Sequence, residues 1–261
     1  MASKFVRYDN DKIVSRNPGF HEDFKSLYTL ASTTLLNSTL TGSTPTAVIA
    51  ASALGGGQLS LFTDTTVNNE AYAWTALNLF PGFLTNQPMV VECQMQWTEA
   101  NTNKAGVIFG FASATKAGIL ADTTGVPIST TMSAAFLYKL KGTTNWHSLT
   151  SVGTTQVDTD LTKQNNFPGV SAAGGPPPNA TSDANQHLYR VEFYPQSSTL
   201  GEARYFIDDA FMHRDVFTTT SSVAMYAIVG IKNLNGTNAE TLVVTDFWGR
   251  VQKLPVTALT I

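Results

Sequence analysis

The chain has 261 residues, of which 43% are hydrophobic and only 13% charged, and its formal net charge at pH 7 is −3. This composition excludes an intrinsically disordered protein, which combines low hydrophobicity with high net charge. The sequence shows no cluster of basic residues that would form a nucleic-acid-binding face. No window of the sequence approaches the ~18 consecutive apolar residues of a membrane span. Cys93 is the only cysteine, so an intrachain disulfide is excluded and a buried thiol is expected.

Residues 1–18 are polar and show no apolar periodicity, so we expect an N-terminal arm. The arm lacks the basic and then apolar pattern of a secretory signal, so we expect synthesis in a cytoplasm. Residues 19–254 are predicted to form one domain, because all-β domains of roughly 200–250 residues are common. Residues 255–261 are expected to form a short apolar tail. Within Leu27–Leu40, interspersed Ser and Thr favour irregular or β structure over a helix.

A series of strand patterns follows along the chain. The clearest is Met89–Trp97, in which apolar residues alternate with Glu92, Gln94 and Gln96, so one face is predicted to be buried and the other polar. Val107–Ala112 is continuously apolar and is expected to be buried on both faces. The other predicted strands are Gln58–Thr63, Glu70–Thr75, Ala134–Leu140, Trp146–Thr150, Leu188–Tyr194, Arg204–Phe211, Ser222–Ile231 and Leu242–Val251.

A long polar stretch, residues 151–185, separates two of these strands and contains the low-complexity run Gly174–Asn179. Proline has no amide donor, so this run cannot belong to a central strand. We predict a long projecting loop within the domain. Loops of this length in compact domains tend to be functional or bound by a partner.

Several segments in a fixed order carry a family resemblance. A Gly-rich turn enters a strand at Gly56–Leu61, Val91–Trp97 forms a long strand, and a Gly-Phe pair follows in Phe109–Phe111. Tyr189–Asp209 and Val244–Trp248 follow as a hairpin and a closing strand. This order, over about residues 55–252, resembles the concanavalin A-like lectin/glucanase jelly roll, including its laminin-G-like branch. The resemblance implies an all-β fold, an antiparallel two-sheet jelly-roll β-sandwich with long loops.

The glucanases of this superfamily use two carboxylates on one strand, and retaining hydrolysis requires them about 5–5.5 Å apart. Glu92 has no such partner, because glutamine occupies the second position after it. Asp158 and Asp160 have the right spacing, but a turn is the favoured interpretation of that region. The adjacent pair Asp208-Asp209 would point to opposite faces of a strand. We therefore expect no catalytic residues and no enzymatic activity.

Metal and cofactor signatures are equally weak. The turn Asp64–Asn69 offers oxygen atoms that suit calcium, but Asp and Asn are also ordinary turn residues. The four histidines are scattered without the spacing of a zinc site. We expect neither a metal ion nor a cofactor.

Glycan binding requires exposed aromatic rings that stack on sugar faces, next to polar groups that bond the hydroxyls. The candidate residues for such a surface are Trp74, Tyr138 and Trp146. The competing interpretation for all three is packing in the core or in an interface. Trp97 and Trp248 lie in strongly apolar patterns, so we expect both in the core.

Three functions remain open. The Thr-, Ser-, Asn- and Gly-rich, charge-poor composition and the resemblance to phage jelly rolls favour a structural protein of a tailed-phage virion. Such a capsid decoration or cement protein would bind the major capsid protein or other virion proteins and itself, with a trimer expected. The alternative is a lectin-like module that binds glycans, possibly on a virion during host attachment. An enzyme acting on polysaccharide is the least favoured.

Overall fold

The computed structural model describes residues 19–24, 36–42, 44–51, 57–83, 87–99, 104–114, 117–128, 132–163, 179–219, 223–235 and 237–252. The expected arm at residues 1–18 and tail at 255–261 lie outside these ranges and stay predictions. In chain order the elements are β1 (Gly19–Glu22), β2 (Leu36–Thr41), β3 (Thr46–Ala51), β4 (Gly57–Phe62), β5 (Glu70–Thr75), β6 (Met89–Thr98), β7 (Ala105–Ala112), β8 (Ala134–Lys139), β9 (Trp146–Val152), β10 (Thr155–Asp160), the 3₁₀ helix η1 (Leu161–Lys163), β11 (Gln186–Pro195), β12 (Leu200–Ile207), β13 (Ala210–Thr218), β14 (Tyr226–Asn233) and β15 (Thr241–Val251).

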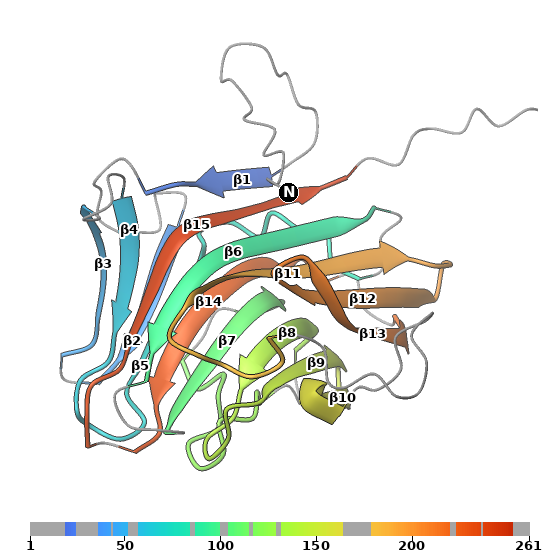
Figure 1. Ribbon diagram of the computed structural model, residues 1–261. Helices are drawn as coiled ribbons and strands as arrows, with labels where there is room; N and C mark the ends of the chain where they lie inside the picture. The colour runs from blue at the N-terminus through green and yellow to red at the C-terminus, as the bar shows by residue number, and fades with distance from the viewer. Residues whose placement is uncertain are drawn as a thin grey trace, which may run out of the picture.

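The strands form two antiparallel sheets that pack face to face (Figure 1). The first sheet has the order β13-β12-β11-β6-β15-β4-β3, with β1 paired to one end of β15. The second has the order β10-β9-β8-β7-β14-β5-β2. The predicted all-β, two-sheet antiparallel sandwich is therefore confirmed. Among the described residues no helix has the length and apolarity that crossing a membrane requires.

Alternation along β6 places its two kinds of side chain as predicted. Met89, Val91, Cys93, Met95 and Trp97 lie in the core between the sheets. Glu92, Gln94 and Gln96 occupy the opposite, outer face of the first sheet, as strand geometry requires. All eight residues of β7 are buried, because both faces of the second sheet are covered at this strand. Its outer face packs into a second apolar cluster with Ile119, Leu120 and Met132 from the connection between β7 and β8.

The segment Arg204–Phe211, predicted as one strand, forms parts of two strands. β12 ends at Ile207 and β13 begins at Ala210, so the chain reverses at Asp208-Asp209. Both aspartates have positive φ, +51° and +62°. Two-residue hairpin turns of type I′ require positive φ at both positions, and Asp tolerates this better than most residues. The hairpin predicted within Tyr189–Asp209 is confirmed as the pairing of β11 with β12.

The predicted loop at residues 151–185 is wrong in its first part. β9 continues to Val152, the chain turns at Gly153 with φ +61°, and β10 then pairs with β9. β10 is an exposed edge strand, so its polar sequence lacks the apolar alternation on which the prediction depended. Asp158 and Asp160 accordingly lie on a strand and not in a turn. Residues 164–178 lie outside the described part of the chain.

A buried hydrogen-bonded group ties the two sheets together near β9 and β12. The hydroxyl of Tyr205 lies 2.6 Å from Thr150 Oγ1 and 3.1 Å from the carbonyl oxygen of Leu149. Thr150 in turn donates to Asp215 Oδ2 at 2.7 Å, and His213 Nε2 lies 2.8 Å from Asp215 Oδ1. Because Tyr205 belongs to the first sheet and Thr150 to the second, these bonds fix the distance between the layers at this side.

Removing the Tyr205 hydroxyl should destabilise the sandwich. We expect Tyr205→Phe to lower the free energy of unfolding by about 1–3 kcal/mol, because the buried Leu149 carbonyl and Thr150 hydroxyl lose a partner. Urea denaturation followed by tryptophan fluorescence measures the difference. The control is Tyr226→Phe, a half-buried tyrosine of β14, for which a change within about 0.5 kcal/mol is expected. An equal decrease in the free energy of unfolding for the two variants would contradict a specific role of the Tyr205 hydrogen bonds between the sheets.

Candidate ligand-binding site

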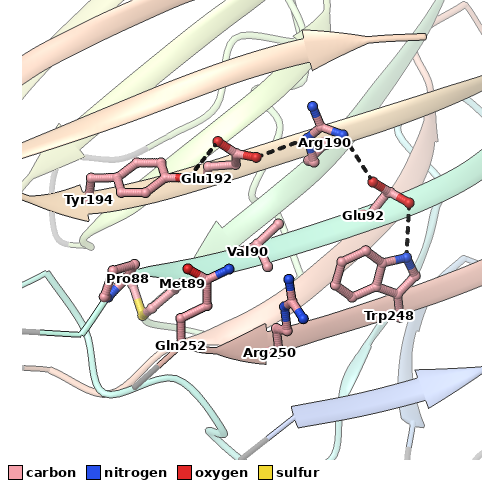
Figure 2. Close-up of a pocket in the computed structure, with 10 residues that line it drawn as sticks. All are labelled: Pro88, Met89, Val90, Glu92, Arg190, Glu192, Tyr194, Trp248, Arg250 and Gln252. Atoms are coloured by element: carbon pink, nitrogen blue, oxygen red, sulfur yellow. Dashed lines mark hydrogen bonds and ion pairs between the residues drawn. The ribbon is translucent and has the colours of Figure 1, made fainter. Parts of the chain in front are cut away.

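A pocket of about 160 Å³ opens on the outer face of the first sheet, over β6, β11 and β15. Figure 2 shows β11 residues along one side and β15 residues along the other, with Val90 of β6 between them. Its lining residues are Pro88, Met89, Val90, Glu92, Arg190, Glu192, Tyr194, Trp248, Arg250 and Gln252. The pocket therefore combines an indole ring, two carboxyl groups, two guanidinium groups and a side-chain amide.

Strand register brings these residues together. In the pairing of β6 with its two neighbours, Arg190, Glu92 and Trp248 stand directly opposite one another. The next row toward the strand ends pairs Glu192 and Arg250 across Val90 in the same way. Directly opposed residues of antiparallel strands share one face and lie close enough to interact. The site is thus two cross-strand rows built from positions that are far apart in the sequence.

Arg190 is surrounded by carboxylates. Its Nη1 lies 2.6 Å from Asp209 Oδ1 and 3.5 Å from Glu92 Oε2, and its Nε lies 3.0 Å from Glu192 Oε1. The guanidinium also stacks over the Phe206 ring, with its Cζ atom 4.3 Å from the ring centroid. Burial by itself lowers the pKa of Arg190, but the hydrogen bond with Asp209 and the neighbouring glutamates outweigh it and raise that pKa.

Glu92 orients Trp248. The carboxyl group of Glu92 accepts a hydrogen bond of 2.9 Å from the Trp248 indole N–H, and the Glu92 residue is only 5% exposed. Burial raises the pKa of Glu92 above its ordinary value, although the bonds from Trp248 and Arg190 oppose that change. On the other side of the pocket, Tyr194 donates to Glu192 Oε2 at 3.1 Å. These contacts hold the indole ring and the acids in fixed positions around the opening.

The three aromatic residues predicted to stack on sugars lie elsewhere. Trp74, Tyr138 and Trp146 have exposed fractions of 6%, 0% and 2%. The first two belong to the apolar cluster on the outer face of the second sheet, and Trp146 packs between the sheets against Tyr189. A buried ring offers no face to a sugar, so we correct this assignment to packing residues.

Trp248 was expected in the core, but it lies half-buried in the pocket. The reason is a bulge in β15, where Thr245 is inserted between the residues that pair with Met95 and Gln94. Before the bulge the even-numbered residues Leu242 and Val244 face the core, and after it odd-numbered residues such as Phe247 do. An inserted residue reverses the alternation, so Trp248 points outward. The polar pair Thr245-Asp246 within an apolar strand was the available signal.

Asp64, the residue considered for calcium, organises its own turn. Its Oδ1 accepts from the Thr66 amide at 2.8 Å and from the side chain of Asn69, and its Oδ2 accepts from the Thr44 amide and hydroxyl, each at 3.1 Å. Burial opposes ionisation, but these hydrogen bonds prevail and lower the pKa of Asp64 to about 2. Within the described ranges no group of three or more His, Cys, Asp or Glu residues is placed to hold a metal ion.

Comparison with known proteins identifies the fold. No protein-family model and no curated protein matches the chain by sequence. Among solved structures, a protein of unknown function from Shewanella oneidensis MR-1 matches with a TM-score of 0.53 and 11% identity, covering 91% of this chain and 89% of its own. Peanut lectin matches with a TM-score of 0.50 and 9% identity, covering 92% and 99%. The fold is therefore the concanavalin A-like lectin/glucanase jelly roll, as the resemblance implied.

The comparisons also correct the expectation that the chain is not an enzyme. An endo-β-1,4-glucuronan lyase from the fungus Trichoderma reesei matches with a TM-score of 0.50 and 10% identity, covering 88% of this chain and 94% of its own. The fold thus carries a catalytic site in one matching protein and is found in a lectin as well. The absence of two carboxylates on one strand argues only against the retaining hydrolysis of the glucanases. It does not exclude enzymes that use another mechanism.

The hydrogen bonds of Asp64 predict an acid-sensitive contribution to stability. A carboxyl group whose pKa is lowered in the folded state stabilises it above the unfolded value, near 3.8, and this stabilisation is lost as pH falls through about 2. We expect Asp64→Asn to cost about 2 kcal/mol at neutral pH, with the difference from the unaltered chain shrinking below pH 4. Urea denaturation at several pH values measures it, and Asp158→Asn on the exposed edge strand is the control. A difference that does not change with pH would contradict this role.

Proposed function

We propose that this chain binds carbohydrate, and that the ligand occupies the pocket over β6, β11 and β15. Sugar recognition requires an accessible aromatic face together with groups that exchange hydrogen bonds with hydroxyls. The pocket supplies both, with the Trp248 ring beside the carboxyl groups of Glu92 and Glu192 and the amide of Gln252. The fold shared with peanut lectin supports the proposal at the level of architecture.

The observation that carries the proposal is the position of Trp248. The other three tryptophans, Trp74, Trp97 and Trp146, are buried, whereas Trp248 keeps part of its ring accessible at the pocket. Its indole N–H is already bonded to Glu92, so the ring is held in place before a ligand arrives. Aromatic groups with one apolar face and one satisfied polar end are suited to such contacts, and preorganisation reduces the entropy lost on binding.

The size of the pocket limits what part of a ligand it can enclose. At about 160 Å³ it is smaller than the roughly 300–1,000 Å³ of pockets that surround a drug-sized ligand. We therefore expect it to hold one sugar unit, with the remainder of the glycan lying over the outer face of the sheet.

Binding should depend on the β15 residues of the pocket. We expect the purified chain to bind members of an immobilised glycan panel, and Trp248→Ala and Arg250→Ala to weaken that binding about tenfold or more, equivalent to about 1.4 kcal/mol. Calorimetry with the best-bound glycan measures the change. Arg214→Ala, an exposed arginine on the edge strand β13, is the matched control and should bind normally. Failure to bind any glycan, or unchanged binding in both pocket variants, would refute the proposal.

The structural role in a virion, as a capsid decoration protein that also binds itself, is our second candidate. Two of the sheet edges support self-association. β2 and β3 end the two sheets in the described part of the chain, and neither strand contains a charged residue. Val48 on β3 is 50% exposed. Soluble proteins usually protect edge strands with charges, bulges or proline, so uncharged edges favour pairing with another strand.

A charge on the β3 edge should prevent such pairing. We expect the purified chain to be oligomeric at micromolar concentration in light scattering, and Val48→Lys to shift it toward the monomer, because lysine on an edge disfavours strand addition. Val216→Lys on the opposite edge strand β13 is the control, since that strand already carries charged residues. A monomer for the unaltered chain would exclude self-association, and co-sedimentation with capsid shells would test the virion role directly.

A further inference from the structure

His187 lies between two carboxylates. Its Nδ1 is 2.5 Å from Asp208 Oδ2, and its Nε2 is 2.8 Å from Asp183 Oδ1. The side chain is 11% exposed. A neutral imidazole carries a single N–H, so it can donate to one of these acceptors only. Two charge-assisted bonds require the imidazolium, and the geometry therefore describes the protonated form.

The surroundings of His187 favour its charged form. Asp208 faces the ring from the turn between β12 and β13, and Asp183 faces it from the segment before β11. The residue opposite on β6 is the uncharged Met95, and on its own strand Tyr189 presents its ring 6.2 Å away. Burial lowers the pKa of His187, but the two aspartates outweigh burial and raise that pKa above the ordinary value of 6.5.

The same turn connects His187 to the pocket. Asp208 accepts from the Leu188 amide at 2.8 Å and from the side-chain amide of Asn179 at 2.6 Å, in addition to its bond with His187. The next residue, Asp209, bonds Arg190 at 2.6 Å. Both aspartates have positive φ, a conformation that is unfavourable for non-glycine residues and persists only where neighbours hold it. His187 therefore contacts Asp208, the first residue of this strained turn, and Asp209, the second residue, contacts Arg190.

We propose that His187 is a positioning residue for the ligand site, acting through the Asp208-Asp209 turn on Arg190, and that loss of its proton loosens the site as pH rises. When the imidazolium gives its proton to solvent, Asp183 or Asp208 keeps no N–H donor from the ring. In the neutral tautomer that keeps its N–H toward Asp183, the turn loses one of its restraints, and Asp209 no longer fixes Arg190 against Glu92. The consequence for ligand affinity rests on the proposed carbohydrate binding, whereas the movement of Arg190 does not.

The direction of the pH effect follows from the pKa of His187. A histidine whose pKa is raised by folding stabilises its contacts fully below the unfolded value of 6.5, and this stabilisation is lost as pH rises through the folded value. The ordered state of Arg190 therefore belongs to pH values below the folded pKa of His187, and the loosened state to pH values above it.

NMR spectroscopy of the full chain, without any ligand, tests the coupling. The imidazole resonances of His187, the Arg190 Nε–H and the Asp209 amide are followed from about pH 6 to about pH 9, where histidine is the side chain that titrates most readily. We expect all three to change with one midpoint above 6.5. In His187→Gln the transition at Arg190 and Asp209 should disappear. In Asp183→Asn, which removes one acid from the ring, the common midpoint should move to lower pH.

His21 supplies the matched control. It is bonded to a single carboxylate, Asp246, at 2.9 Å, and lies opposite Trp248 in the pairing of β1 with β15, so it titrates close to the pocket. The transition at Arg190 should persist in His21→Gln. Arg190 signals that do not follow His187, or that keep their midpoint in Asp183→Asn, would overturn the proposal.

If the glycan panel yields a ligand, its affinity adds a second readout. We expect binding to weaken about fivefold across the same pH range, and His187→Gln to remove this dependence. A chain that binds no glycan but shows the shared midpoint would refute the proposed function and leave the positioning role intact. A chain that binds glycan but shows no shared midpoint would refute the positioning role of His187 and leave the proposed function intact.

Discussion

The pairing of β6 between β11 and β15 is the constraint on which both the core and the candidate site depend. One set of β6 side chains, including Met89, Val91 and Cys93, fills the space between the sheets. The other set presents Glu92 to Arg190 on one neighbour and to Trp248 on the other. Because the side-chain period of a strand is two, a slip by one residue would exchange these sets and abolish core and pocket together.

Charge balance shapes the site built on this pairing. A guanidinium placed among strands is costly unless carboxylates compensate it, and Arg190 has three within reach. Glu92 and Glu192 come from the sheet itself, whose geometry is rigid. Asp209 comes from a turn with strained backbone, which His187 holds through the adjacent Asp208. Asp209 is thus the one partner of Arg190 that lies in a turn and not in a strand.

Much of the fold was predictable, because burial on one face leaves an alternation that is visible in the sequence. Met89–Trp97 is the example, whereas the predicted strands at β8 and β9 are buried on both faces. β10 was missed because an exposed edge strand carries no apolar alternation. The prediction of aromatic residues for glycan binding was wrong, because aromatic character does not distinguish an exposed ring from a buried one. Trp74 and Tyr138 belong to the second apolar cluster.

The sequence by itself determined the class of fold and the buried face of β6, because local alternation and turn residues report directly on strands. Only the tertiary structure decided where the pocket lies. Trp248 faces outward because Thr245 is inserted in β15, and a single extra residue is recognised only against the partner strand. Glu92, Arg190 and Trp248 meet because three distant segments pair in one register. That register depends on contacts across the whole sheet, which no local pattern contains.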